Sequence, residues 1–124
     1  MNPRPVSTTY EVPGSKWVNL NGSHGHPRAH QGSMNEWKDR AAIAIRAAGC
    51  TPLDAPVTIT ATVHRVTNAK ADSHNVTPSI KACIDAAVEC GLIPDDNDDI
   101  VTRLVIERGE KRPKPTITIR IDCA

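Results

Sequence analysis

The chain has 124 residues, of which 39% are hydrophobic and 23% are charged, and its formal net charge is +1 at pH 7. This length and composition predict one globular domain over residues 1–124 and exclude a membrane-spanning or disordered chain. Because no apolar stretch follows the N-terminus, we expect no secretion signal, no membrane partner and a cytoplasmic location.

The four cysteines are scattered and form no Cys-x-x-Cys pair. This spacing argues against a zinc site or a redox motif. In a reducing compartment such residues behave as small hydrophobes. We therefore expect Cys50, Cys83, Cys90 and Cys123 to be free thiols that contribute to packing.

The first half of the chain predicts a strand, a long loop and a helix. A short strand is expected over residues 7–12, and residues 15–33 form a polar loop long enough to be mobile or functional. Ser33 and Glu36 match a capping box, so the helix is predicted over residues 33–48. Trp17 is interpreted as an anchor of the loop, with base stacking as the alternative.

The second half of the chain predicts a strand, a helix and two more strands. Hydrophobic residues alternate with threonine over residues 56–66, which is typical of a strand. A helix is predicted over residues 78–90, with Thr77 as its N-cap and Pro78 at its first position. Strands over 100–106 and 116–121 complete the order β-α-β-α-β-β. The predicted fold class is α/β (α+β), a small mixed sheet with two helices.

Charge is segregated along the chain, although the net charge is small. The acids between residues 72 and 101 are Asp72, Asp85, Glu89, Asp95, Asp96, Asp98 and Asp99, against Lys81 alone. The segments on both sides are rich in lysine and arginine. An acidic patch within a basic frame suits a metal-dependent nuclease, since basic residues hold phosphates and acids hold the cation. The alternative is a solvated surface with uneven charge.

The acidic segment contains the residue types that phosphodiester hydrolysis requires. Asp72 precedes the second helix, and Asp95 and Asp96 follow it. Two or more carboxylates can hold Mg²⁺ and leave coordination positions open for water and phosphate. Lys81, on the helix between them, could neutralise charge that develops on the phosphate.

This segment resembles the signature of the RusA-type Holliday junction resolvases, which are dimeric, Mg²⁺-dependent nucleases. The resemblance covers about a quarter of the chain, from Asp72 to Val101. It implies a RusA-like fold and resolution of Holliday junctions or other branched DNA. The implied catalytic residues are Asp72, Lys81 and Asp96; the implied metal ligands are Asp72, His74, Asp95 and Asp96; the implied supporting residues are Asn75 and Asp85.

Two departures from the family pattern affect these expectations. His74 stands where the family has a second aspartate, and imidazole is a poorer ligand for Mg²⁺ than carboxylate, so Mn²⁺ is a second expected cofactor. A few extra residues separate Asn75 from Lys81.

Asp72 and the Asp95/Asp96 pair flank a helix about 20 Å long, so they meet only if the chain doubles back or if two subunits share a site.

The expected partners are branched DNA and a second copy of the chain, because symmetric cutting of two strands needs two symmetric sites. The expected DNA contacts are Lys16, Arg28, Lys70, Arg103, Lys111 and Arg112. One alternative is a DNA-binding module with a weakened or inactive nuclease site, and another is a metal-binding protein unrelated to nucleic acids. The small size and the resemblance suggest an origin in a phage or prophage of a bacterial host.

Overall fold

The computed structural model describes residues 4–18, 27–67 and 76–124. Within these residues, six elements follow one another in the predicted order, β-α-β-α-β-β. They are β1 (Ser7–Pro13), α1 (Pro27–Ala47), β2 (Val57–His64), α2 (Thr77–Glu89), β3 (Val101–Arg108) and β4 (Thr116–Cys123). The predicted fold class, a mixed sheet with two helices, is confirmed.

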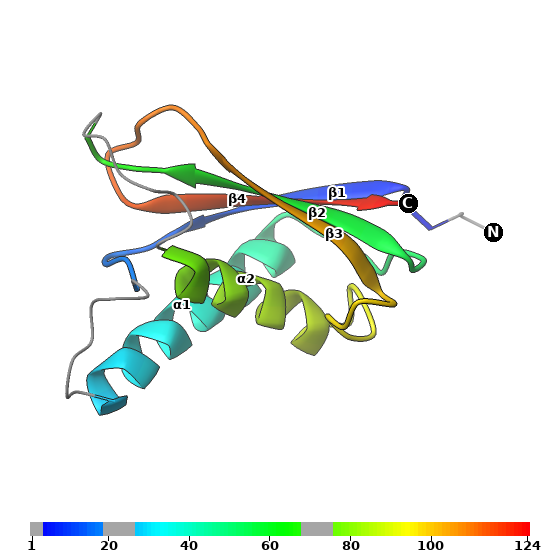
Figure 1. Ribbon diagram of the computed structural model, residues 1–124, viewed down its shortest axis with the longest axis horizontal. Coiled ribbons are helices and arrows are strands. Elements are labelled where there is room, and N and C mark those ends of the chain that lie inside the picture. The colour runs from blue at the N-terminus through cyan, green and yellow to red at the C-terminus, as the bar shows by residue number, and fades with distance from the viewer. Residues whose placement is uncertain (1–3, 19–26, 68–75) are drawn as a thin grey trace.

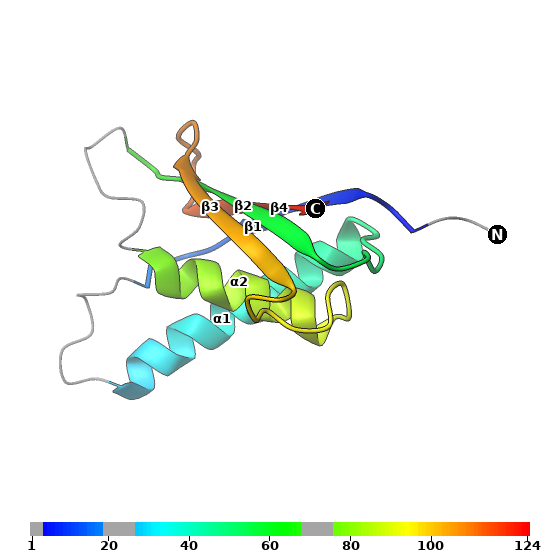
Figure 2. The same ribbon diagram turned by 45° about the vertical axis from the view of Figure 1, so that its right-hand side comes forward.

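The strands form one four-stranded sheet in the order β1-β4-β2-β3, and both helices cover the same face of it (Figure 1). β4 is antiparallel to β1 and to β2, whereas β2 and β3 are parallel. Turned by 45°, the molecule shows the two helices lying side by side beneath the sheet (Figure 2). The β2–α2–β3 segment is therefore a crossover connection, which places α2 beneath the sheet.

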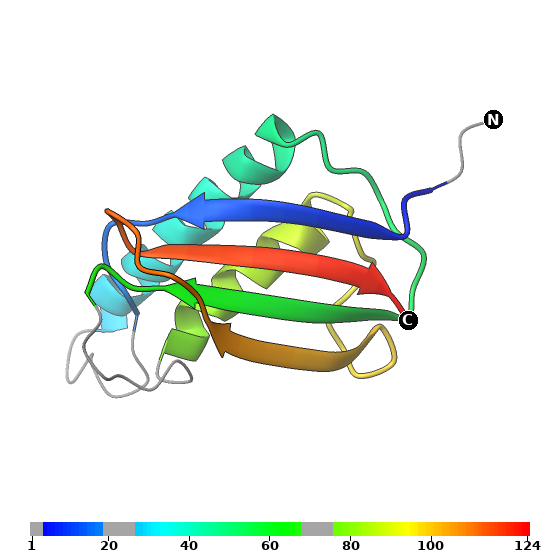
Figure 3. The ribbon, with the colours of Figure 1, turned by 90° about the horizontal axis from the view of Figure 1, so that it is seen from above.

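The core lies between the sheet and the helices. Its strand residues are the apolar ones that alternate with polar residues in the sequence. On β2 the apolar side chains of Val57, Ile59, Ala61 and Val63 are fully buried, while the threonines between them face the opposite side. On β4 the alternating apolar side chains are also fully buried, namely those of Ile117, Ile119 and Ile121. Seen from above, neither α1 nor α2 lies on the second face of the sheet (Figure 3).

The first helix begins earlier than the sequence predicted. α1 starts at Pro27, a residue suited to the first turn of a helix, so residues 27–33 are helical and not part of a loop. The capping box predicted at Ser33 is wrong, because Ser33 lies inside the helix. The Glu36 carboxylate instead accepts a hydrogen bond from Ser15 Oγ at 2.7 Å and pairs with Arg40 at 3.1 Å.

The start of the second helix also differs from its prediction. Thr77 is the first residue of α2 and not its N-cap. The N-cap position belongs to Val76, which is fully buried and makes no side-chain capping hydrogen bond. Burial of Val76 in the core therefore helps to position this end of α2.

The segment after β1 is tied to both helices. Trp17 stacks on Trp37 of α1 with ring centroids 5.4 Å apart, and Trp37 Nε1 donates a hydrogen bond to the Lys16 carbonyl at 2.6 Å. The Val18 amide donates to the hydroxyl of Ser79, a fully buried residue of α2, at 2.8 Å. The interpretation of Trp17 as an anchor of its segment agrees with these contacts.

All four cysteines are free thiols, as predicted. Cys83 is fully buried, and burial raises the pKa of its thiol, so it does not act as a nucleophile at neutral pH. Its backbone carbonyl accepts a hydrogen bond from the buried Tyr10 hydroxyl at 2.8 Å, which joins β1 to α2. Among the described helices, none has the length and apolar character that crossing a membrane requires.

Candidate functional site

The exposed face of α2 carries the two charged residues that the sequence placed four apart. Lys81 Nζ lies 3.1 Å from Asp85 Oδ1, so the predicted pair on one helix face is confirmed. The opposite face of α2 is buried against the core through Ile80, Ala87 and their neighbours. Packing of that apolar face fixes the rotation of the helix and directs Lys81 and Asp85 toward solvent.

The chain after α2 turns back along the helix. Gly91 has a φ of +78°, a left-handed conformation that glycine adopts readily, and it ends the helix. Leu92 and Ile93 are then buried, which fixes the returning segment against the core. This return brings Asp96 beside Lys81 in the first half of the helix.

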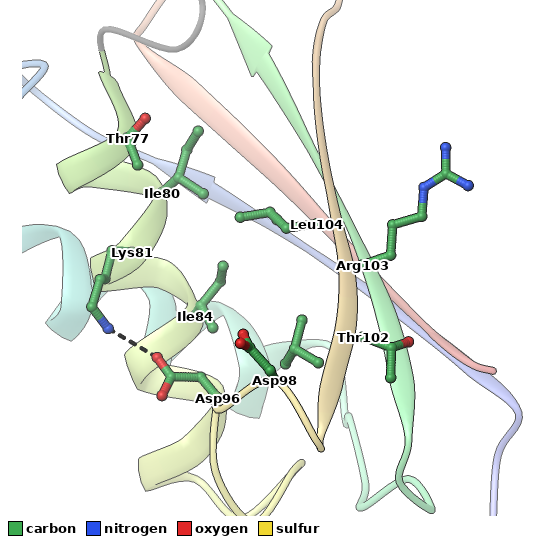
Figure 4. Close-up of a pocket in the computed structure, with 10 residues that line it drawn as sticks. Thr77, Ile80, Lys81, Ile84, Asp96, Asp98, Thr102, Arg103 and Leu104 are labelled. Carbon is green, nitrogen blue, oxygen red and sulfur yellow. Dashed lines mark hydrogen bonds and ion pairs between the residues drawn. The ribbon is translucent and has the colours of Figure 1, made fainter.

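Lys81 bridges the helix and the returning segment. Its ammonium lies 2.9 Å from Asp96 Oδ2 (Figure 4). The same ammonium also contacts Asp85 Oδ1 at 3.1 Å. The hydrogen bond from Lys81 lowers the pKa of Asp96. The pKa of Lys81 is raised, chiefly by its hydrogen bond to Asp96 and further by Asp85. Lys81 is therefore a cation held between two carboxylates at neutral pH.

The acidic turn, residues 95–99, is organised by Asn97, a residue that the sequence analysis did not single out. Asn97 Oδ1 accepts hydrogen bonds from the amides of Asp99 at 3.0 Å and Ile100 at 3.2 Å. Its Nδ2 donates to Asp95 Oδ2 at 3.2 Å, and Asp95 Oδ1 accepts the Asp96 amide at 2.7 Å. Asparagine within an aspartate-rich turn is a signal for this role, because Asn and Asp bond their own backbone.

A groove of about 440 Å³ lies between α2 and the edge strand β3, and Lys81 and Asp96 stand at its rim. Apolar side chains of Ile80, Ile84 and Leu104 form its wall. Asp98 also lines the groove and points into the space between helix and strand (Figure 4). The groove thus combines an apolar wall with a rim that carries one ammonium and two carboxylates.

The structure brings together three of the predicted site residues, Lys81, Asp85 and Asp96. Asp95 lies in the same turn, but both of its carboxylate oxygens accept hydrogen bonds within the turn. The predicted residues Asp72, His74, Asn75 and Lys70 lie outside the described residues. The structure therefore shows the contact of Lys81 with Asp96, but it does not describe where Asp72 lies relative to them.

The predicted DNA contacts are spread over several elements. Arg103 on β3 is one of the residues that line the groove, and its guanidinium extends away from α2 (Figure 4). Lys111 is exposed in the connection between β3 and β4. Arg112 pairs with Glu11 of β1 and, at 2.9 Å, with Glu110, so a phosphate would compete with two carboxylates for it. Lys16 follows β1, and Arg28 lies in the first turn of α1, where its side chain is outside the described residues.

The described part of the chain holds no group of three histidine, cysteine or acidic side chains that could bind a metal ion. Asp96 and Asp98 provide carboxylate oxygens at the groove, which is the donor type that Mg²⁺ prefers. These two carboxylates are therefore of a donor type that suits a hard divalent cation. In comparisons with known proteins, no family model and no curated sequence matches this chain.

We predict that Lys81→Met lowers the free energy of unfolding by less than about 1 kcal/mol at neutral pH, because the lysine side chain is 57% exposed. Folding lowers the pKa of Asp96. The stabilisation that its contact with Lys81 gives is therefore complete above the pKa of Asp96 in the unfolded chain, and it is lost as the pH falls through the pKa of Asp96 in the folded chain. The free energies of unfolding of wild type and variant, measured in urea, should therefore differ at pH 7 and converge once the pH falls below the folded-state pKa of Asp96. Lys111→Met, which removes an exposed lysine, is the control and should show no such convergence.

Proposed function

We propose that this protein is a divalent-metal-dependent endodeoxyribonuclease that resolves Holliday junctions or other branched DNA. The observation that carries the proposal is the contact between Lys81 of α2 and Asp96 of the acidic turn, at 2.9 Å. Asp96 matches the closing acidic pair in the signature of the RusA-type resolvases, which the sequence resembles, and Lys81 matches its lysine apart from the few extra residues that precede it. The same resemblance supports a homodimer, a bacterial cytoplasmic location and an origin in a phage or prophage as parts of the proposal.

The groove offers the chemistry that phosphodiester hydrolysis needs. Asp96 would hold Mg²⁺ or Mn²⁺ together with Asp98 and with Asp72, and the bound ion would supply charge neutralisation and an acidified water. Asp85 keeps its contact with Lys81 and so holds the ammonium close to Asp96. Lys81 would stabilise the negative charge that develops on the phosphate.

The alternative, a DNA-binding module with a weakened or inactive site, has one observation in its favour. The Asp96 carboxylate already has an internal cation, and Asp95 uses both oxygens within its turn. A divalent ion would have to compete with Lys81 for Asp96. This competition lowers metal affinity, so weak metal binding distinguishes the alternative from an active nuclease.

A four-way junction and a linear duplex of matched sequence test the proposal directly. The protein is incubated with each substrate in Mg²⁺, in Mn²⁺ or in EDTA, and strand cleavage and binding are both measured. We expect paired nicks in the junction with either metal and none in EDTA or in the duplex. Selective binding without cleavage would favour the inactive module, and absence of both would favour a metal-binding protein unrelated to DNA.

A further inference from the structure

Among the strands of the described residues, β3 forms an open edge of the sheet. It stands last in the strand order, and Figure 3 shows it along the outer side of β2. Its eight residues include no proline, and Leu104 is 42% exposed. An edge strand presents unpaired backbone N–H and C=O groups that can pair with another strand.

The opposite edge, β1, is less available for pairing. β1 ends in Pro13, whose carbonyl accepts a hydrogen bond from Arg40 of α1 at 3.4 Å. The Thr9 carbonyl is contacted by Cys50 Sγ at 3.8 Å. Proline and neighbouring side chains are common means of protecting a strand edge, so β3 is the edge better suited to a partner.

The two faces of β3 differ in chemistry. Leu104 pairs with Ile59 and Ile106 with Ala61, so these two apolar side chains lie on the face that the helices cover. Arg103, Val105 and Glu107 alternate with them and lie on the open face of the sheet. Neither Arg103 nor Glu107 makes an ion pair with another residue in the described ranges.

We propose that two copies of this chain associate through antiparallel pairing of their β3 strands, centred on Val105. In this register Arg103 lies opposite Glu107 of the partner subunit, and the symmetry repeats this pair. Leu104 lies opposite Ile106 of the partner subunit on the helix-covered face, also twice. Val105 meets its own copy at the two-fold axis. The sequence of β3 is thus complementary to itself in charge and in hydrophobicity, as an isologous interface requires.

Other registers lose this complementarity. A two-fold axis at Arg103 or at Glu107 sets like charges against each other, and an axis at Leu104 sets Arg103 against Val105. The ends of β3 also favour the antiparallel direction. The acidic turn precedes β3 and the basic residues Lys111, Arg112 and Lys114 follow it, so antiparallel pairing brings each acidic end beside a basic end.

The resulting dimer has one continuous eight-stranded sheet with the helices of both subunits on the same face. The groove beside β3 then lies on each side of the two-fold axis, which places two copies of the Lys81–Asp96 site on one face of the assembly. This inference deepens the homodimer of the proposed function but rests on strand chemistry alone. Dimerisation without cleavage, or cleavage by a monomer, would separate the two proposals.

Charge exchange on β3 tests the register. Arg103→Glu and Glu107→Arg each replace two opposite-charge pairs by two like-charge pairs, and each should weaken the dimer at least about tenfold in sedimentation equilibrium. The double variant restores opposite charges and should return the dissociation constant to within about twofold of wild type. Arg120→Glu, an equal charge change on the central strand β4, is the control and should leave it unchanged.

A cysteine at the two-fold axis gives a second measurement. Directly opposite residues of antiparallel strands have Cα atoms about 4.5–5.5 Å apart, which a disulfide can span. Val105→Cys should therefore form a covalent dimer on mild oxidation, whereas wild type and Ile43→Cys, an exposed position on α1, should not. A monomeric wild type at all concentrations, double-variant dimers as weak as the single ones, or no Val105→Cys dimer above the controls would overturn the proposal.

Discussion

Replacement of Asp96 by asparagine is expected to reduce metal-dependent cleavage of a four-way junction by at least about 100-fold, since loss of even an indirect metal-site partner costs 10–100-fold. Asparagine keeps the size of the side chain but removes the negative charge that would hold the cation. Lys81 would retain its contact with Asp85 at 3.1 Å, so the helix face should remain organised. Because Asp96 lies at the rim of the groove and not in the core, the variant should fold normally.

Cleavage rates under single-turnover conditions, junction affinity in EDTA and divalent-ion affinity by calorimetry check this expectation together. The rate and the metal affinity should both fall, while junction affinity in EDTA should not weaken. Asp54→Asn is the matched control, because Asp54 is an exposed acid whose partner is Arg4, away from the groove. Undiminished cleavage by Asp96→Asn would show that the catalytic acids lie elsewhere.

Replacement of Trp37 by alanine is expected to lower the free energy of unfolding by about 3–5 kcal/mol. Trp37 is 2% exposed, and its ring packs so closely on Gly14 that a Cβ added there would lie 2.3 Å from it. The substitution also removes the stacking on Trp17 and the hydrogen bond to the Lys16 carbonyl. The variant would therefore lose the contacts that hold the segment after β1 against α1.

Chemical denaturation followed by far-UV circular dichroism measures this loss. Ile43→Ala on the same helix is the control, because Ile43 is 63% exposed and should change stability by no more than about 0.5 kcal/mol. Trp37→Phe should fall between the two, since it keeps an aromatic ring but removes the indole N–H. A Trp37→Ala variant as stable as the Ile43→Ala control would contradict the assignment of Trp37 to the core.

Two predictions made from the sequence pattern were wrong because each rested on a single polar residue. Ser33 and Glu36 match a capping box, yet α1 begins at Pro27 and Glu36 bonds Ser15 instead. Likewise the polar Thr77 was predicted to cap α2, but the position belongs to the buried Val76. A cap contributes only about 1 kcal/mol, which burial of one apolar side chain can exceed.

The order of the elements, the buried faces of β2 and β4 and the Lys81–Asp85 pair were determined by the sequence alone. Each depends on a period of two or on a spacing of four residues, which local backbone geometry converts directly into a face. The contact of Lys81 with Asp96, the ties of Arg112 to Glu11 and the open edge of β3 were decided only by the tertiary structure. These features depend on where the chain returns after Gly91 and on which strands pair, and no local periodicity encodes such long-range choices.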